Sequence, residues 1–176
     1  DPGNAYAHCT LGLLLEIERL DIDGAEAAYR AAIEADPGFA AAHFNLGALL
    51  KEQRQNIGAA EAAYRAAIAA CAGNAPAHFH TNLGILLTEK ERNDIDGAIA
   101  AYRAAITAEP EAASQAHFNL GLLLEKERKD VDGAEAAYRA AIAADPGYAK
   151  AHFNLSLLLK NERKDIDGAE AAFRAT

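Results

Sequence analysis

The hydrophobic positions between residues 111 and 146 predict two consecutive amphipathic helices. The first helix is expected from about Glu111 to Arg128, and its apolar face is formed by His117, Leu120, Leu123 and Leu124. The apolar face of the second helix is formed by Val131, Ala134, Tyr138, Ala141 and Ile142. Both sets follow the 3.6-residue period of an α-helix. We therefore expect this stretch to fold as a helical pair.

This two-helix pattern occurs five times along the chain. Residues 43–64 and 117–138 have closely similar sequences, and further copies begin near Leu11, Leu83 and Leu155. A period in the mid-thirties indicates stacked units that each bury an apolar face against their neighbours. The units are expected at about 4–37, 38–72, 73–110, 111–146 and 147–176. Residues 1–176 should form a single array, and we expect it to be a fragment of a longer one.

Residues suited to helix ends separate the helices of each unit. Asp130 offers a side-chain carboxylate to the first free amides of the second helix. Asp145-Pro146-Gly147 ends that helix, because proline cannot continue it and glycine tolerates a left-handed turn. In the other copies the cap position is occupied by Asp21, Asn56, Asp94 and Asp165.

The repeated text resembles the tetratricopeptide repeat family over almost the whole chain. In the second copy the resemblance is carried by His43, Leu46, Gly47, Ala60, Tyr64 and Ala67. Five copies in register make the resemblance specific, although each unit has one extra residue in the turn between its helices. The resemblance implies an all-α fold: a right-handed α-solenoid, or superhelix, of stacked antiparallel helix pairs.

Several repeated residues are expected to serve packing. Gly121 is expected to face Ala134, which would let the two helices of the pair approach closely. Four histidines stand where the family often has tryptophan: His8, His43, His117 and His152. We expect them to be structural, because side chains one repeat apart are too distant to share a metal ion. His78 and His80 are expected to be more exposed.

The overall charge excludes some partners. A net charge of −9 and a pI of about 5.1 argue against nucleic acids and anionic membranes, because such binding depends on Lys and Arg. No apolar run approaches the ~20 residues of a membrane span, and no signal-peptide pattern is present. We expect a soluble intracellular protein, with no compartment identified. Cys9 and Cys71 are expected to be buried or half-buried free thiols, with a disulfide as the minor alternative.

No motif supports catalysis. Asp130-Val131-Asp132-Gly133 resembles part of a calcium loop, but Arg128 and Arg139 stand where its first and twelfth ligands belong. The chain has no phosphate-binding loop, nucleophile elbow or His-Glu-x-x-His zinc pair. We therefore expect no enzyme, no cofactor and no metal site.

The outward face of the first helix in each unit is the candidate binding surface. In the family this face lines a concave groove that accepts peptides, and here it is largely apolar with a row of asparagines beside it. The predicted groove residues are Phe44, Asn45, Ala48, Asn82, Ile85, Phe118, Asn119, Leu122, Phe153, Asn154 and Leu157. Alternatively, the asparagines and phenylalanines contact the array itself, and the two interpretations are not exclusive.

These features predict a protein–protein interaction scaffold or adaptor that binds an extended or helical peptide segment. Phe44 and Phe118 stand where family members that grip a C-terminal carboxylate have lysine. An apolar or mixed peptide, or a helix, is therefore the expected partner. Two alternatives stay open: a structural solenoid that forms a homo-oligomer or larger assembly through its ends, and the targeting arm of a larger enzyme.

Overall fold

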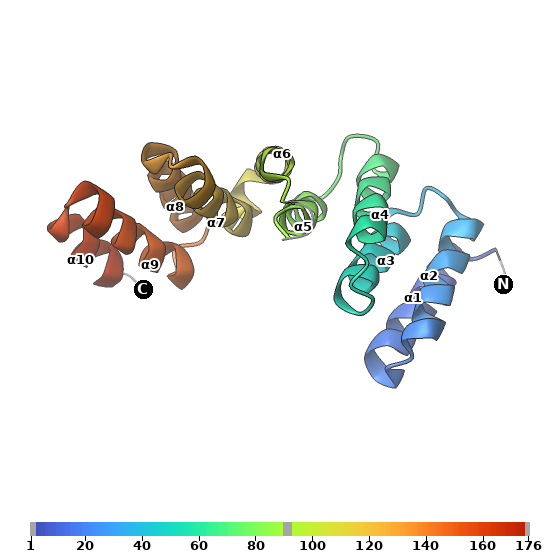
Figure 1. Cartoon of the computed structure of the whole chain (residues 1–176). Helices are drawn as coiled ribbons and strands as arrows, with labels where there is room; N and C mark the ends of the chain where they lie inside the picture. The colour runs from blue at the N-terminus through green and yellow to red at the C-terminus, as the bar shows by residue number, and fades with distance from the viewer. Residues whose placement is uncertain (1–2, 90–92, 175–176) are drawn as a thin grey trace. The chain divides into compact units, whose positions relative to one another are not determined.

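The computed structural model describes residues 3–89 and 93–174, which form only helices, turns and loops (Figure 1). The chain divides after Asn93 into two compact units. The first unit contains α1 (Ala5–Leu14), the π-helical turn η1 (Leu15–Arg19), α2 (Ile22–Ala35), α3 (Ala40–Glu52), α4 (Ile57–Ala70) and α5 (Ala77–Leu87). The second contains α6 (Ile95–Ala108), the 3-10 turn η2 (Pro110–Ala112), α7 (Ser114–Leu123), η3 (Leu124–Arg128), α8 (Val131–Ala144), α9 (Ala149–Leu158), η4 (Leu159–Arg163) and α10 (Ile166–Arg174).

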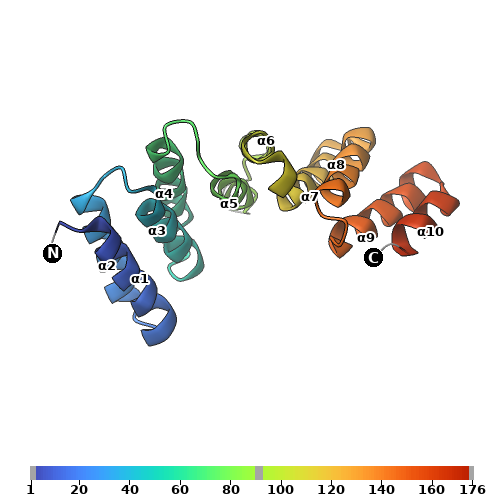
Figure 2. The same cartoon turned by 180° about the vertical axis from the view of Figure 1, so that it is seen from behind.

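Consecutive helices form antiparallel pairs within each unit, as Figures 1 and 2 show from opposite sides. In the first unit α1 packs on α2 and α3 on α4, and in the second α7 packs on α8 and α9 on α10. Successive pairs meet through α2 and α3, and through α8 and α9. The predicted all-α fold of stacked helix pairs is therefore confirmed. The predicted repeat at 73–110 contributes α5 to one unit and α6 to the other, and a single continuous array stays a prediction.

The predicted acidic and amide caps begin the second helix of each pair. Asp130 Oδ1 accepts a hydrogen bond of 2.9 Å from the backbone N–H of Gly133, three residues into the helix. Equivalent bonds are made by Asp21, Asn56, Asp94 and Asp165. Each satisfies one of the amides that a helix start leaves unpaired.

In the first, fourth and fifth copies the extra residue is absorbed where the first helix ends. In the fourth copy the carbonyl of Leu124 accepts hydrogen bonds from the backbone N–H groups of Lys129 and, at 2.8 Å, Asp130. The chain thus widens into a π-helical turn, and Lys129 adopts a left-handed conformation with φ of 57°. Leu15 and Leu159 head the same turn in the first and fifth copies.

The glycine of the first helix packs against a tyrosine of the second. A Cβ atom added to Gly121 would lie 2.7 Å from Cε1 of Tyr138, and one added to Gly47 would lie 2.8 Å from Cδ1 of Tyr64. The prediction that Gly121 faces Ala134 was wrong in its partner, because the ring of Tyr138, one helical turn further on, covers the glycine. Both tyrosines are at most 1% exposed.

Two of the buried tyrosines donate hydrogen bonds to glutamates. Tyr29 Oη donates to Glu16 at 2.8 Å, and Tyr138 Oη donates to Glu125 at 2.6 Å. Burial and the nearby carboxylate raise the pKa of both phenols, since each disfavours the phenolate. These bonds join the end of the first helix to the middle of the second.

The two cysteines are free thiols in the structure. Cys9 is buried and Cys71 is half-buried. Burial raises the pKa of the Cys9 thiol, an effect that the hydrogen bond from Asn45 opposes. Among the described residues, no helix combines the length and apolar character needed to cross a membrane.

Candidate functional site

An apolar pocket of about 410 Å³ opens on the last helix pair, α9 and α10. Two predicted groove residues, Phe153 and Leu157, line it from α9 and are 48% and 39% exposed. Ile166 and Phe173 line it from α10 and are 59% and 55% exposed. Four large apolar side chains thus share one solvent-facing hollow. Surface clusters of this kind usually mark contact sites.

The position of Phe153 and Leu157 follows from the burial of the opposite face of α9. Leu155 and Leu158 are at most 6% exposed and pack in a core cluster with Tyr138 of α8. Phe153 and Leu157 are spaced four residues apart and therefore share the other face of the helix. The helical period thus directs them away from the core and into the pocket.

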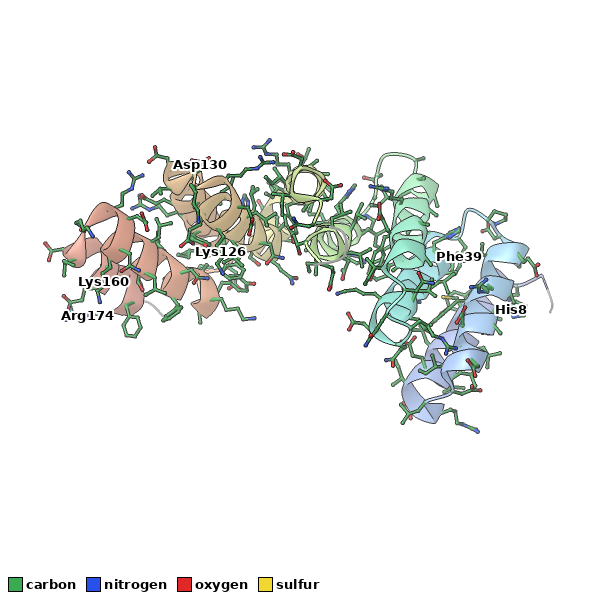
Figure 3. The ribbon with its side chains drawn as sticks, in the orientation of Figure 1. His8, Phe39, Lys126, Asp130, Lys160 and Arg174 are labelled. Carbon is green, nitrogen blue, oxygen red and sulfur yellow. The ribbon has the colours of Figure 1, made fainter. Side chains whose placement is uncertain are left out.

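The rim of the pocket carries charges of both signs. Lys160 lines it from the end of the first helix of the pair, and Glu170 lines it from α10. Glu170 also forms an ion pair with Arg174 one helical turn along. Figure 3 shows Lys160 and Arg174 on this last helix pair. A partner with an apolar anchor and flanking polar or charged groups would match this lining.

Phe118 and Phe44 pack mainly against other helices. Phe118 is 8% exposed, and its ring centroid lies 5.4 Å from Tyr148 in an edge-on contact. Phe44 stacks on Phe79 of α5 with centroids 4.5 Å apart. Leu122, Ala48 and Ile85 are half-buried. In the second and fourth copies, residues that follow in the chain therefore cover much of this phenylalanine. Its counterpart in the fifth copy, Phe153, lines the pocket instead.

The asparagine row divides into two kinds of residue. Asn45 Nδ2 donates to Cys9 Sγ at 3.4 Å, and Asn82 Nδ2 donates to the carbonyl of His78 at 2.8 Å. Asn119 and Asn154 are half-buried, and their side chains form no hydrogen bond with any residue in the described ranges 3–89 and 93–174. Asn119 and Asn154 therefore keep all of their amide donors and acceptors available for a ligand, whereas Asn45 and Asn82 each use one donor within the first unit.

Two of the four repeated histidines contact the turn that precedes their helix pair. The Nε2 atoms of His43 and His152 lie 2.9 Å from the carbonyl oxygens of Pro37 and Pro146. Burial lowers the pKa of His117 and of His80, because it disfavours the imidazolium. Of the irregular pair, His78 is exposed and His80 is half-buried. Among the described residues no group of three metal-ligating side chains comes together.

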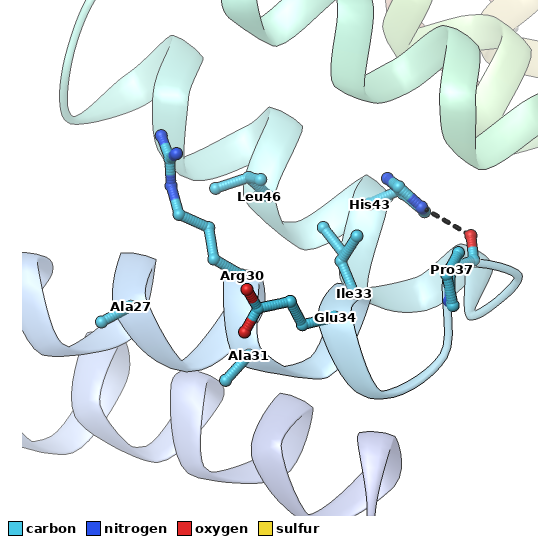
Figure 4. Close-up of a pocket in the computed structure, with 8 residues that line it drawn as sticks. All are labelled: Ala27, Arg30, Ala31, Ile33, Glu34, Pro37, His43 and Leu46. Carbon is cyan, nitrogen blue, oxygen red and sulfur yellow. Dashed lines mark hydrogen bonds between the residues drawn. The ribbon is translucent and has the colours of Figure 1, made fainter. Parts of the chain in front are cut away.

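A second pocket, of about 890 Å³, lies between α2 and α3 and contains none of the predicted groove residues (Figure 4). Its apolar lining includes Ala27, Ala31 and Ile33 of α2 and Leu46 of α3. Figure 4 shows the hydrogen bond between His43 and Pro37, two of the residues that line this pocket. Its large apolar side chains are Ile33, which is half-buried, and Leu46, which is 8% exposed, so it lacks the large exposed anchors of the α9–α10 pocket.

Sequence reasoning missed half of the α9–α10 pocket. Ile166 and Phe173 belong to a second helix, where the pattern predicts burial, as for their counterparts Val131 and Tyr138. Tyr138 is fully buried while Phe173 is more than half exposed.

The comparisons with known proteins agree on one kind of repeat. The family model that matches is described as a tetratricopeptide repeat, and it covers residues 13–75, 86–149 and 127–176. The crystal structure of MamA superposes with a TM-score of 0.79 at 22% identity, over 94% of this chain and 91% of that one. PilF of Pseudomonas aeruginosa gives a TM-score of 0.77 at 25% identity, over 97% and 75%. YrrB gives 0.74 at 21% identity, over 98% and 84%. No curated protein matches the chain.

Proposed function

The chain belongs to the tetratricopeptide repeat family, and we propose that it binds an extended or helical protein segment with the α9–α10 pocket as the anchor site. Repeat proteins of this family mediate protein–protein interactions, and they are typically scaffolds without catalytic activity. We propose no reaction for this chain. The observation that carries the proposal is the exposure of Phe153, Leu157, Ile166 and Phe173 around one pocket.

The chemistry of the pocket favours an apolar anchor. A volume of about 410 Å³ would accept one or two large side chains such as leucine or phenylalanine. Burying such a side chain stabilises a complex by about 1.5–3 kcal/mol. Lys160 and Glu170 on the rim would favour a segment with mixed charges beside its anchor.

The predicted asparagines supply the polar part of the proposal. We propose that Asn119 and Asn154 hydrogen-bond the backbone of the bound segment, because an amide side chain offers both a donor and an acceptor. Asn45 and Asn82 already donate within the first unit, so there we propose a mainly structural role. Phe118 and Leu122 would support the groove floor within the second unit.

A structural neighbour lends support from outside the chain. YrrB is described as a tetratricopeptide repeat protein with an unusual peptide-binding site. That description belongs to YrrB, and its likeness to this chain is one of fold. It supports the proposal to the extent that the same kind of helix array can hold a peptide.

The test is selection of binders from a displayed library of random peptides, followed by titration of the selected peptides against the purified chain. The variants Phe153→Ala and Leu157→Ala should each weaken the affinity by about tenfold or more, because each removes apolar contact area from the pocket. Asn119→Ala combined with Asn154→Ala should weaken it further.

A matched control lies in the same chain. Arg103 is exposed on α6 and lines neither the α9–α10 pocket nor the pocket between α2 and α3, so Arg103→Ala should leave the affinity unchanged. Helical circular dichroism checks that every variant is folded. Selected peptides that bind Phe153→Ala and Leu157→Ala as tightly as the wild type would overturn the proposal.

A further inference from the structure

An arginine at the end of the first helix of a pair forms ion pairs with acidic residues of the preceding pair. Those acidic residues lie at the start of that pair's second helix. Arg54, just after α3, forms ion pairs with Asp23 and, at 3.1 Å, with Glu26 of α2. Arg163 of η4 does the same with Asp132 and, at 3.2 Å, with Glu135 of α8. Arg128 pairs in the same way with Asp96 of α6. Among the described residues, three contacts between successive copies therefore share this ionic pattern.

The first pair has the arginine of this pattern without the acidic residues of a preceding pair. The last pair has the acidic residues without the arginine of a following pair. Arg19 occupies the position of Arg54 and Arg163, and it forms no ion pair with the part of the chain that the structure describes. Asp167 and Glu170 occupy the positions of Asp132 and Glu135. Within the same described ranges, Asp167 has no ionic partner and Glu170 pairs only with Arg174.

The first pair also exposes leucines whose counterparts are buried between pairs elsewhere in the chain. Where α3 meets α2, Leu46 and Leu49 are 8% and 0% exposed. Their counterparts on α1, Leu11 and Leu14, are 45% and 49% exposed. The sequence spacing from these two leucines to Arg19 is the same as the spacing from Leu46 and Leu49 to Arg54. The outer face of α1 and η1 thus keeps the layout of a face that elsewhere packs on a preceding pair.

The last pair exposes the side chains on which the first helix of a following pair would pack. Phe118 and Tyr138 of the fourth copy are 8% and 0% exposed, in a cluster that includes residues of α9. Their counterparts in the fifth copy, Phe153 and Phe173, are 48% and 55% exposed and line the α9–α10 pocket. The side chains that would receive a further first helix are therefore exposed.

We propose that two copies of this chain associate head to tail, with α1 and η1 of one copy docked on α9 and α10 of the other. Leu11 and Leu14 would cover the pocket, and Arg19 would pair with Asp167 and Glu170. This rests on the proposed function, because a helix pair of the second copy is then the protein segment that the pocket accepts. Charge complementarity and the repeated leucine–arginine spacing favour a second copy over an unrelated helix.

The test is a mixing experiment read by sedimentation equilibrium. In one variant Leu11→Asp and Leu14→Asp block the first face, and in the other Ile166→Asp and Phe173→Asp block the last face. The wild type should gain mass with concentration, and each variant alone should stay monomeric. An equimolar mixture should form a one-to-one complex, because only the two intact faces can meet.

Charge reversal tests the ionic part. Arg19→Glu should weaken association by about tenfold. A partner carrying Asp167→Arg and Glu170→Arg should restore it, whereas Arg103→Glu, on α6, should have no effect. A wild type that is monomeric at every concentration, or blocked variants that do not combine, would overturn the proposal. Selected peptides that still bind the pocket in that case would leave the proposed function standing, so the two failures are distinguishable.

Discussion

At the scale of single residues, the contact between glycine and tyrosine sets how closely two helices approach. A Cβ atom on Gly121 would lie 2.7 Å from the Tyr138 ring, well inside ordinary contact distance. The Tyr138 ring cannot move freely, because it is fully buried and its hydroxyl donates to Glu125. The glycine is therefore required by the ring that covers it rather than by a special backbone conformation.

Gly121→Ala should consequently destabilise the protein by about 1–3 kcal/mol through overpacking. Urea denaturation followed by circular dichroism measures this change. The matched control is Gly58→Ala on α4, where an added Cβ atom would meet nothing within 4 Å. Alanine should stabilise that helix by about 0.5–1 kcal/mol. Equal effects of the two substitutions would show that the ring contact at Gly121 is unimportant.

The buried tyrosines make stability depend on alkaline pH. Burial and neighbouring glutamates raise the pKa of Tyr29 and Tyr138 above the ordinary value of 10.0, and burial raises that of Tyr64 to about 12. Above pH 10 the unfolded chain loses these phenolic protons while the folded chain keeps them. The stabilisation is complete below pH 10 and is lost as the pH rises beyond it.

The free energy of unfolding measured by urea denaturation should therefore fall as the pH is raised through 10, by about 1.4 kcal/mol per pH unit for each tyrosine that stays neutral only when folded. Tyr138→Phe should reduce this slope. The same slope in the wild type and in Tyr138→Phe would contradict the assignment.

Residue-scale exposure was the least predictable feature of the candidate site. The repeat pattern directed Phe44 and Phe118 outward, but Phe79 and Tyr148 lie against them. Phe79 stands where other copies have a buried alanine, such as Ala42, and Tyr148 belongs to a turn. A period computed along one helix carries no information about such neighbours, so burial had to come from the structure.

At the scale of elements, the π-helical turn explains how the first, fourth and fifth copies hold one residue more than is usual in the family. Its cost falls on the residue after it, because Leu20, Lys129 and Lys164 adopt φ values of 54°, 57° and 59°. Side chains disfavour this left-handed region, whereas glycine enters it freely. The sequence placed the extra residue before the cap. It gave no sign of the left-handed residue that follows each π-helical turn, since none of these positions is glycine.

Lys129→Gly should stabilise the protein by about 1 kcal/mol by relieving the left-handed strain. Thermal melting or urea denaturation measures the gain. Lys126→Gly, within the turn η3 itself, should instead destabilise by about 0.5–1 kcal/mol, because glycine weakens a helical segment. A loss of stability in Lys129→Gly would mean that lysine makes contacts there that outweigh the strain.

At the scale of the whole molecule, stability in a repeat protein is a sum over units and the contacts between them. In the second unit α8 lies between α7 and α9, whereas α10 is packed on α9 and keeps Phe173 and Ile166 exposed. The number and type of helices and their caps were predictable from the sequence, because they depend on local periodicity. The open pocket was not, because it depends on which faces lack a neighbour.

Amide hydrogen exchange should accordingly be faster in α10 than in α8. Addition of a selected peptide, or a higher protein concentration if copies associate, should slow exchange in α10 with little change in α8. Mass-spectrometric exchange resolves the two helices separately. Equal protection of α8 and α10 in the free protein would contradict the view that the last pair is the least supported part of the second unit.

The central claim is that the α9–α10 pocket is where this protein holds its partner. The most direct test is methyl NMR of leucine and isoleucine side chains during titration with a selected peptide. The account predicts that shifts concentrate at Leu157 and Ile166, which line that pocket. Shifts concentrated instead at Ile33 and Leu46, which line the pocket between α2 and α3, would contradict it.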